Sequence, residues 1–335
     1  MILAAGYGTR LGELTARRPK PMMPLCGAPL VRWTALWLRS QGLRELVINL
    51  HHLGEQIEDE LGDGRALGLA IAYTRESEAI AGTGGGLRDA RALLDAGDGR
   101  PIVAVNGKIM LDLELAPVVA LHERRGAEAT MVLRPDPDAA RWGALEVDED
   151  GGLIGFLGAR HPGRAPAQPQ MFTGVHVLQP AFLDRVPPTG EQCIVRTAYA
   201  AAFAADGADG GARLAGHVHH GYWWEHSTPE RYLQGMRNVL DGRAALAHAE
   251  LDPRGLTPRG VDPRAEVDAG AVIREPVHIG PGARVEAGAE VGPYAQIDGG
   301  AVVRGGARVR DAIVWSGAVV DGDVIGRIEP GDAAG

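Results

Sequence analysis

The chain has 335 residues, a formal net charge of −9 and 45% apolar residues. This length exceeds one typical domain and is sufficient for two. No basic stripe and no long apolar run occur, which argues against a nucleic-acid partner and against a membrane-spanning helix. Cys26 and Cys193 are too few for a disulfide framework or a zinc site, and we expect both to be small buried hydrophobic residues. These properties favour a cytoplasmic protein that acts on small molecules.

The beginning of the chain carries the strongest signal. An apolar start predicts a buried strand. This strand is short because the first motif begins so close to Met1, which is the result expected of a truncated or reassigned start. Gly6 and Gly8 then allow a tight turn that brings backbone N–H groups against phosphate oxygens. Arg10 adds a guanidinium fork and Lys20 a compact charge. This combination predicts a cradle for a triphosphate.

Up to about residue 240, short aliphatic runs alternate with longer helical stretches. Such alternation predicts an α/β fold with a doubly wound sheet. Expected strands include 46–50, 102–105, 130–134 and 174–178, and expected helices include 28–41 and 115–125. Ligands of open sheets gather beyond the carboxyl ends of the strands, so the segments that follow these strands should border one crevice.

The last third of the chain follows a six-residue period. The repeated aliphatic residues are Val261, Val267, Ile273, Ile279, Val285, Val291, Ile297, Val303 and Val309. Small residues stand two places earlier in most repeats, at Ala265, Ala271, Ala283, Ala289, Ala295, Ala301 and Ala307. This period is typical of a parallel β-helix, whose coils stack their aliphatic residues. The register slips after Val309 and resumes at Ile313, Val319 and Ile325, which predicts about three and a half coils with an irregular step.

The run from Leu3 to Leu11, followed by Arg18-Pro19-Lys20-Pro21-Met22, resembles the signature of the sugar-1-phosphate nucleotidyltransferases, or NDP-sugar pyrophosphorylases. The resemblance implies an enzyme that joins a nucleoside triphosphate to a sugar 1-phosphate and releases pyrophosphate, usually with Mg²⁺. Arg10 and Lys20 would be its catalytic residues. The implied organisation is a Rossmann-like, GT-A-like catalytic domain at 1–240, a linker at 241–258 and a short left-handed β-helix at 259–328. The stretch 309–315 is most similar to the mannose-1-phosphate guanylyltransferase branch.

Residue by residue, the resemblance implies two sets of contacts. Nucleotide contacts would come from Leu3, Ala4, Ala5, Gly6, Gly8, Thr9, Arg10, Lys20, Gly82, Thr83, Gly84 and Asn106. Sugar-phosphate contacts would come from Gly143, Thr173 and Gly174. The glycine-rich run at 82–86 resembles a loop that reads the nucleobase, and a flexible turn is the alternative interpretation.

The chain departs from the family pattern where the metal is expected. Lys108 occupies the position of the usual aspartate ligand, and a protonated lysine has no acceptor with which to ligate Mg²⁺. Glu225 replaces the second aspartate and remains a candidate ligand, followed by His226 as either a ligand or an exposed ring. Lys20 and Lys108 are the only lysines in the chain. The metal site is therefore expected to be weakened, and Arg160 is a candidate cation for the sugar phosphate.

Three functions remain open. The first is a working nucleotidyltransferase, with GTP and mannose 1-phosphate favoured, in which Glu225 and the phosphates hold Mg²⁺ or the Lys108 ammonium replaces part of its charge. The second is a nucleotide-sugar-binding or regulatory homologue with weak or no turnover. The third is a hexapeptide acyltransferase, which needs a general base. His278 is the only histidine in the repeat, and a surface or stacking role is favoured for it. We also expect a homo-oligomer formed through the β-helix.

Overall fold

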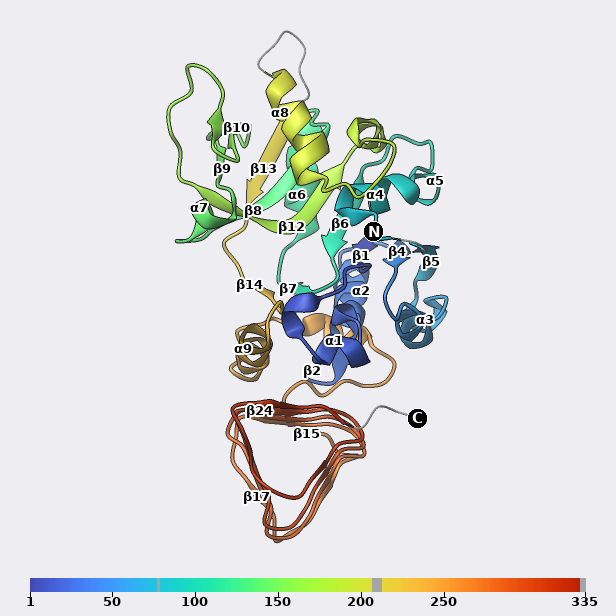
Figure 1. The fold of residues 1–335 in the computed structure, drawn as a ribbon, viewed down its shortest axis with the longest axis vertical. Helices are drawn as coiled ribbons and strands as arrows, with labels where there is room; N and C mark the ends of the chain where they lie inside the picture. The colour runs from blue at the N-terminus through green and yellow to red at the C-terminus, as the bar shows by residue number, and fades with distance from the viewer. Residues whose placement is uncertain (77–78, 207–212, 332–335) are drawn as a thin grey trace.

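The computed structural model describes residues 1–76, 79–206 and 213–331. A mixed sheet flanked by helices forms one end of the elongated molecule, and a β-helix with a triangular cross-section forms the other (Figure 1). Within the described residues, no helix combines the length and the apolar character that crossing a membrane requires.

The mixed sheet contains ten strands. One half is parallel, with β1 (Ile2–Leu3) between β6 (Ile102–Asn106) and β4 (Glu45–Leu50), followed by β5 (Ala70–Arg75). In the other half, β12 (Gln170–Leu178) runs antiparallel to both β6 and β8 (Ala129–Pro135). The remaining strands are β9 (Leu145–Val147), β10 (Leu153–Phe156), β11 (Ala159–Arg160) and β13 (Leu214–Val218). The expected doubly wound mixed sheet is confirmed.

The described helices alternate with these strands. They are α1 (Leu14–Arg17), α2 (Leu30–Ser40), α3 (Glu55–Leu61), α4 (Gly82–Asp89), α5 (Arg91–Leu94), α6 (Leu115–Arg124), α7 (Ala139–Trp142), α8 (Ala200–Asp206) and α9 (Pro229–Leu240). Short 3₁₀ segments lie at Thr9–Leu11, Lys20–Met22, Arg65–Leu67, Pro180–Arg185 and Ala247–Leu251, and a π-helical turn lies at Val195–Tyr199. Helix α2 starts later than its pattern predicts, because β3 (Ala28–Pro29) first pairs with β2 (Pro24–Leu25).

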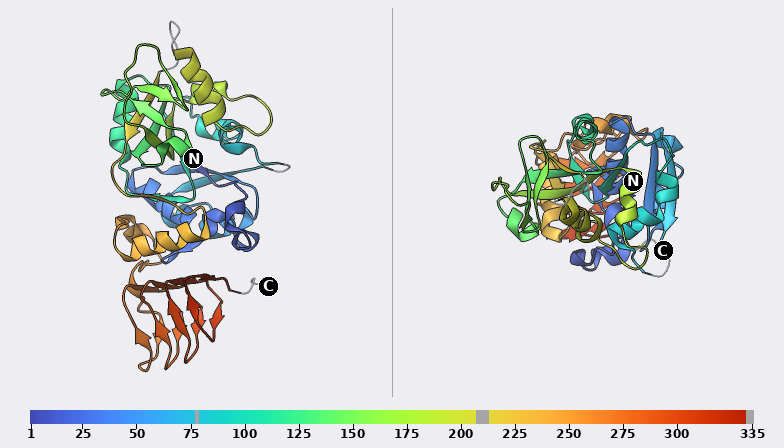
Figure 2. Two further views of the ribbon diagram at one scale, coloured as in Figure 1. Left: turned by 60° about the vertical axis from the view of Figure 1, so that its left-hand side comes forward. Right: turned by 90° about the horizontal axis from the view of Figure 1, so that it is seen from above.

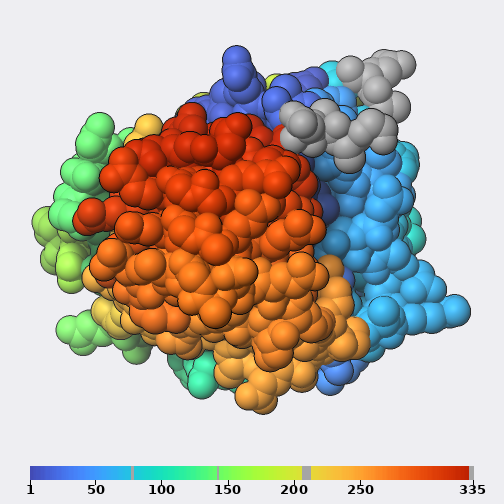
Figure 3. Space-filling view, turned by 90° about the horizontal axis from the view of Figure 1, so that it is seen from below, coloured from blue at the N-terminus to red at the C-terminus, as the bar shows by residue number. Residues whose placement is uncertain are grey.

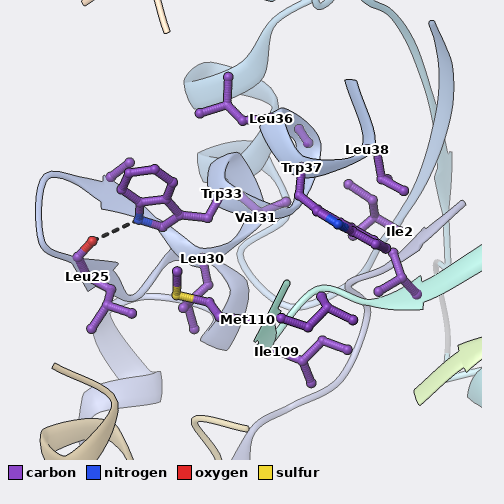
Figure 4. Close-up of a cluster of buried hydrophobic side chains, with 14 of the residues drawn as sticks. Ile2, Leu25, Leu30, Val31, Trp33, Leu36, Trp37, Leu38, Ile109 and Met110 are labelled. Carbon is purple, nitrogen blue, oxygen red and sulfur yellow. Dashed lines mark hydrogen bonds between the residues drawn. The ribbon is translucent and has the colours of Figure 1, made fainter. Parts of the chain in front are cut away.

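Helix α2 packs its apolar face against the sheet. Trp33, Leu36 and Leu38 are almost fully buried, and Figure 4 shows them in one cluster with Ile2 and Met110. The indole N–H of Trp33 donates to a backbone carbonyl at 2.8 Å, so this buried polar group is satisfied. Burial of this kind, at roughly 25 cal/mol per Å² of apolar surface, holds β1 and the loop that follows it.

The β-helix consists of three parallel sheets of five, four and four strands. The first is β15 (Gly260–Val261), β18 (Val277–Ile279), β21 (Ala295–Ile297), β24 (Ala312–Val314) and β27 (Ile328–Glu329). The second is β16 (Glu266–Val267), β19 (Arg284–Val285), β22 (Val302–Val303) and β25 (Val319–Val320). The third is β17 (Val272–Ile273), β20 (Glu290–Val291), β23 (Arg308–Arg310) and β26 (Val324–Ile325). The arrangement is consistent with a left-handed β-helix, and it has more coils than the repeat predicts.

The predicted register of the last coil is wrong. Ile297 pairs with Val314, Val303 with Val320 and Val309 with Val324. The interior stack therefore continues through Val314, Val320 and Val324. The predicted residues point elsewhere: Val319 and Ile325 are more than half exposed, and Ile313 joins the core of the catalytic part. The reason is that the coil after Ile297 lacks one residue, which turns the side chains that follow to the other face of their strands. A second shortening, of two residues, lies between Val320 and Val324.

The first sheet of the β-helix faces the catalytic part, and α9 lies beside it (Figures 1 and 2). Figure 3 shows the β-helix over the centre of the opposite end of the molecule.

The predicted burial of Cys193 is wrong, and so is the surface role, one of the two considered for His278. Cys26 is buried as predicted, but Cys193 is exposed. His278 is not on the surface: it is 1% exposed beside the turn at Gly27, and its Nδ1 lies 2.9 Å from the carbonyl of Thr257.

Candidate active site

A cleft of about 300 Å³ opens at the carboxyl ends of β1, β4 and β6. Most of the residues predicted to contact the nucleotide line it: Leu3, Ala4, Ala5, Gly6, Gly8, Thr9, Arg10, Lys20, Gly82, Thr83 and Asn106. Lys108 lines it as well. Their roles as nucleotide contacts stay a prediction, and the fold brings them to one place as parallel-sheet topology requires.

The loop after β1 is held in a conformation that favours glycine. Gly8 has φ 68°, and a Cβ atom there would lie 2.9 Å from Cγ2 of Thr15. Two histidines hold this loop from outside: His51 Nε2 lies 2.9 Å from the Tyr7 hydroxyl, and His52 Nε2 lies 2.8 Å from the carbonyl of Thr15. The histidine pair is therefore structural.

Lys20 is the most buried cation of the cleft, with 6% of its surface exposed. It lies at the start of a 3₁₀ turn whose proline at the next position fixes the backbone. Burial, followed by the charges of Lys108 and Arg10, lowers the pKa of Lys20 to about 8. Three cations thus converge on one cavity, which is the arrangement that a polyanion needs.

The glycine-rich run at 82–86 is helical and not a loop or a flexible turn. It forms the first half of α4, and its glycines allow close approach to the segment at 192–194. The N–H of Gly84 donates to the carbonyl of Gln192 at 2.7 Å, and a Cβ on Gly82 would lie 2.6 Å from the same oxygen. Gly82 and Thr83 line the cleft, whereas Gly84 is buried behind it.

Lys108 and Glu225 form an ion pair at the edge of the cleft. They are brought together by a two-stranded sheet in which β14 (Trp223–Glu225) pairs with β7 (Ile109–Leu111). Nζ of Lys108 lies 2.5 Å from Oε1 of Glu225, and a guanidinium nitrogen of Arg10 lies 3.9 Å from the same oxygen. Burial acts to raise the pKa of Glu225, but the Lys108 ammonium, together with Arg10 and Lys20, outweighs it and the net pKa is held below its ordinary value.

His226 is neither an exposed ring nor placed as a metal ligand. It is fully buried, its Nδ1 lies 3.2 Å from the carbonyl of Lys108, and Nε2 has no hydrogen-bond partner among the described residues. Burial lowers the pKa of His226 to about 4. The ring fills space against Gly235 of α9, where a Cβ would lie 2.2 Å from Nε2.

The residues present do not fit Mg²⁺ in the mode that the resemblance implies. Within the described part of the chain, no group of three or more His, Cys, Asp or Glu side chains could hold a metal ion. The carboxylate of Glu225 already faces Lys108, and Arg10 and Lys20 add two further positive charges nearby. A divalent cation placed there would meet strong repulsion.

A second cavity, of about 380 Å³, adjoins the first and shares Arg10 and Asn106 with it. The predicted sugar-phosphate residues Gly143, Thr173 and Gly174 line it, as does Glu225. Gly174 has φ 90°, and a Cβ there would lie 2.3 Å from Nδ2 of Asn106, so only glycine fits beside this asparagine.

An arginine that was not predicted, Arg231, lines the second cavity, and Arg160 does not. Arg160 lies on the edge strand β11, ion-paired with Glu146 at 2.6 Å, and lines neither cavity. Arg231 lines the second cavity: its Nε donates to the carbonyl of Glu225 at 2.9 Å, and its guanidinium stacks over Trp224 at 4.2 Å. Thr228 caps the start of α9, which fixes Arg231 in the first turn.

Sequence reasoning also missed Asn49 and Glu76 in the first cleft. Asn49 donates to Glu76 Oε1 at 2.7 Å, its Oδ1 accepts from the N–H of Ala4 at 2.9 Å, and Glu76 Oε2 accepts from the N–H of Ala81 at 2.7 Å. The available signal was position, since Asn49 lies next to the last residue of β4 and Glu76 follows β5, in the parallel half of the sheet that carries the cradle.

The family model described as "Nucleotidyl transferase" matches residues 1–224. The chain belongs to the nucleotidyl transferase family. The mannose-1-phosphate guanylyltransferase of Mycobacterium tuberculosis is 30% identical to this nucleotidyl transferase over 285 residues, which cover 84% of this chain and 76% of that protein. The N-acetylmuramate alpha-1-phosphate uridylyltransferase of Neisseria meningitidis is 36% identical over 196 residues, 56% of this chain and 82% of that one.

Solved structures agree on the fold of this nucleotidyl transferase. A protein from Bacillus anthracis assigned as a glucose-1-phosphate thymidylyltransferase superposes with a TM-score of 0.58 at 17% identity, covering 70% of this chain and 92% of that one. HddC from Yersinia pseudotuberculosis superposes with a TM-score of 0.55 at 20% identity, covering 71% and 97%. At these identities the similarity concerns the fold alone.

Proposed function

We propose that this nucleotidyl transferase moves a nucleoside monophosphate from a nucleoside triphosphate to a sugar 1-phosphate. The observation that carries the proposal is the pair of adjoining cavities that meet at Arg10 and Asn106. The first holds three cations beside a glycine turn and suits a triphosphate. The second is larger, carries Arg231 and Trp223, and suits a phosphorylated sugar.

The reaction is an in-line displacement. A phosphate oxygen of the sugar 1-phosphate attacks the α-phosphorus, the bond from that phosphorus to the oxygen of the β-phosphate breaks, and pyrophosphate leaves. The backbone turn at Gly8, with Arg10 and Lys20, would hold the triphosphate and neutralise charge that develops on it. Arg231 would hold the incoming phosphate.

GTP and mannose 1-phosphate are the favoured substrates. The relative named for them aligns with 84% of this chain, which extends into the β-helix. Glu76 adds a physical argument, because it is the one carboxylate among the described residues that line the first cleft. A carboxylate accepts two hydrogen bonds from the N1–H and N2–H edge of guanine, whereas uracil offers one N–H on its pairing edge.

The alternative is a nucleotide-sugar-binding homologue with weak or no turnover. The Lys108–Glu225 ion pair favours it, because that pair lies where the resemblance implies metal ligands. Binding would be retained in this case, since Gly8, Arg10 and Lys20 all line the cleft.

Pyrophosphate release decides between the two. The assay covers the four nucleoside triphosphates and a panel of sugar 1-phosphates, each with Mg²⁺ and with a chelator, and uses Lys20→Met as the inactive control. Highest release with GTP and mannose 1-phosphate would support the proposal. Release with UTP instead would correct the base, and GTP binding without release in any combination would establish the binding homologue.

The place of action and the assembly complete the proposal. We propose a cytoplasmic enzyme that self-associates through its β-helix. Val319 and Ile325 of the last coil are more than half exposed, which suits burial against a second copy. Light scattering of the full chain beside a Val319→Asp, Ile325→Asp variant tests this, and equal masses at the monomer value for both would contradict it.

A further inference from the structure

Lys108 keeps N–H donors available to a ligand in the cleft while it is ion-paired with Glu225. Lys108 lines the same cleft as Lys20 and Arg10, with about a quarter of its side chain exposed to the cavity. An ammonium group has three N–H donors. One is directed at Glu225, so two remain available to an anion in the cleft.

Glu225 is positioned to hold the Lys108 ammonium in place. Its Oε1 faces Lys108 at 2.5 Å and Arg10 at 3.9 Å, and one-fifth of its side chain is exposed. The β7–β14 pairing fixes both residues, because the N–H of His226 donates to the carbonyl of Lys108 at 3.2 Å. Lys108 is thereby kept at the mouth of the cleft instead of extending into solvent.

We propose that the Lys108 ammonium, held by Glu225, supplies at the triphosphate the positive charge that a protein-bound divalent cation would supply, so that the nucleotide binds without a metal ion. The inference rests on the proposed function for its substrate, a nucleoside triphosphate. Its physical basis is that Arg10, Lys20 and Lys108 line the cleft, where Glu76 is the one carboxylate of the described lining and Glu225 is paired with Lys108. The three cations therefore outnumber these two carboxylates.

The direction in which Mg²⁺ changes the affinity for the nucleotide follows from this arrangement of charges. Mg²⁺ in solution binds to a triphosphate and reduces its negative charge. A cleft that carries an excess of positive charge attracts the magnesium complex less than the free nucleotide. A cleft with two carboxylates behaves in the opposite way, because the cation then bridges protein and phosphate.

The experiment measures the dissociation constant of GTP by calorimetry, with excess Mg²⁺ and with EDTA. For the natural protein, we expect Mg²⁺ to leave the affinity unchanged or to weaken it. For Lys108→Asp, which restores two carboxylates, we expect Mg²⁺ to tighten binding about tenfold or more. For Lys108→Met in EDTA, we expect a loss of about tenfold, with a smaller loss for Lys108→Arg.

Two results would overturn the inference: tenfold tighter binding of GTP by the natural protein when Mg²⁺ is added, or equal affinities of the natural protein and Lys108→Met in EDTA. The first needs no variant and decides the question even if a substitution prevents folding. Arg65→Met is the matched control, because it removes a comparable charge from a side chain that does not line the cleft and is 89% exposed.

Failure of the proposed function is distinguishable from failure of this inference. If no sugar 1-phosphate yields pyrophosphate, the binding measurements still report on Lys108. If transfer occurs only with Mg²⁺, and Mg²⁺ also tightens GTP binding by the natural protein, the inference fails while the proposed function stands.

Discussion

The indole N–H of Trp315 in the β-helix donates to the hydroxyl of Tyr232 in α9 at 3.2 Å. The same hydroxyl donates to the carbonyl of Pro24, four residues after Lys20. Both side chains are fully buried. The β-helix is therefore part of the framework that positions the cradle, and its Ile313 and Trp315 share a core with β1 and α2.

Replacing Trp315 by alanine tests this shared core. The change removes a large buried side chain and a hydrogen bond, so we expect the free energy of unfolding to fall by about 3–5 kcal/mol. Val272→Ala is the control: that valine is on the same β-helix, 41% exposed and outside the proposed surface of Val319 and Ile325, so its loss should stay within about 0.5 kcal/mol. Urea unfolding of the two variants checks this, and equal effects would show that the interface contributes little.

Asp298 makes the same interface sensitive to pH. It is buried, and Gln296 donates to its Oδ1 at 2.8 Å. Burial raises the pKa of Asp298 to about 7, against about 3.9 in the unfolded chain. Because the folded pKa is the higher one, the stability contributed is complete below about pH 4 and is lost as pH rises through about 7. The protonated form suits this site, since Oδ2 has no hydrogen-bond partner among the described residues that could stabilise a carboxylate charge.

Asp298→Asn isolates that contribution. Buried histidines such as His278, whose pKa burial lowers to about 4, oppose the trend because they lose stability as pH falls below about 6.5. We therefore compare the variant with the natural protein at each pH. The two should be similar near pH 4, and the variant should be more stable by a few kcal/mol at pH 8. A difference in unfolding free energy that does not grow with pH would contradict this.

Gly174→Ala should damage the junction of the two cavities. The added methyl would meet Nδ2 of Asn106 at 2.3 Å, and φ 90° is unfavourable for alanine. Displacement of Asn106 by about 1 Å is expected to lower kcat/KM about a hundredfold. Gly163→Ala is matched in backbone conformation, with φ 75°, but its methyl meets no atom within 4 Å. Similar activities of the two variants in the pyrophosphate assay would show that Asn106 does not position the substrates.

Much of this architecture can be predicted from the sequence because local patterns determine it. The glycine turn follows an apolar strand, and the six-residue period stacks by itself up to Val309. The register beyond Val309 was not predictable, because one deleted residue leaves two adjacent aliphatic residues, Ile313 and Val314, as equal candidates for the interior. The core of the catalytic part decided between them by burying Ile313.

Some features of the candidate site were likewise predictable from the sequence, and others were not. Residues that follow the strands of one sheet edge were predictable, since topology brings them together. The proximity of Lys108 and Glu225 was implied only by the resemblance, which gives both residues the positions of metal ligands. The topology of the main sheet does not predict it, because the contact depends on the antiparallel pairing of β7 with β14, two short strands outside that sheet. Arg231 was missed for a similar reason: its place in the second cavity depends on where α9 begins.

Lys20 should make nucleotide affinity depend on pH. Burial and the neighbouring cations lower its pKa to about 8, so the free protein loses this charge as pH rises from about 7 to 9. A bound triphosphate favours the ammonium, so binding becomes linked to the uptake of a proton in that range. The dissociation constant of GTP should therefore increase by up to about tenfold per pH unit above pH 8.

Lys20→Arg separates this residue from the other groups of the cleft. A guanidinium stays charged throughout the range, so the variant should bind GTP with a nearly constant affinity between about pH 7 and pH 9, even if the different shape of the side chain weakens binding overall. The comparison therefore concerns the slope of affinity with pH and not its absolute value. The same slope in both proteins would assign the proton to another group and would mean that Lys20 stays charged in the free protein. A slope confined to the natural protein would place Lys20 in contact with the triphosphate, because only a group that interacts with the ligand changes its proton affinity on binding.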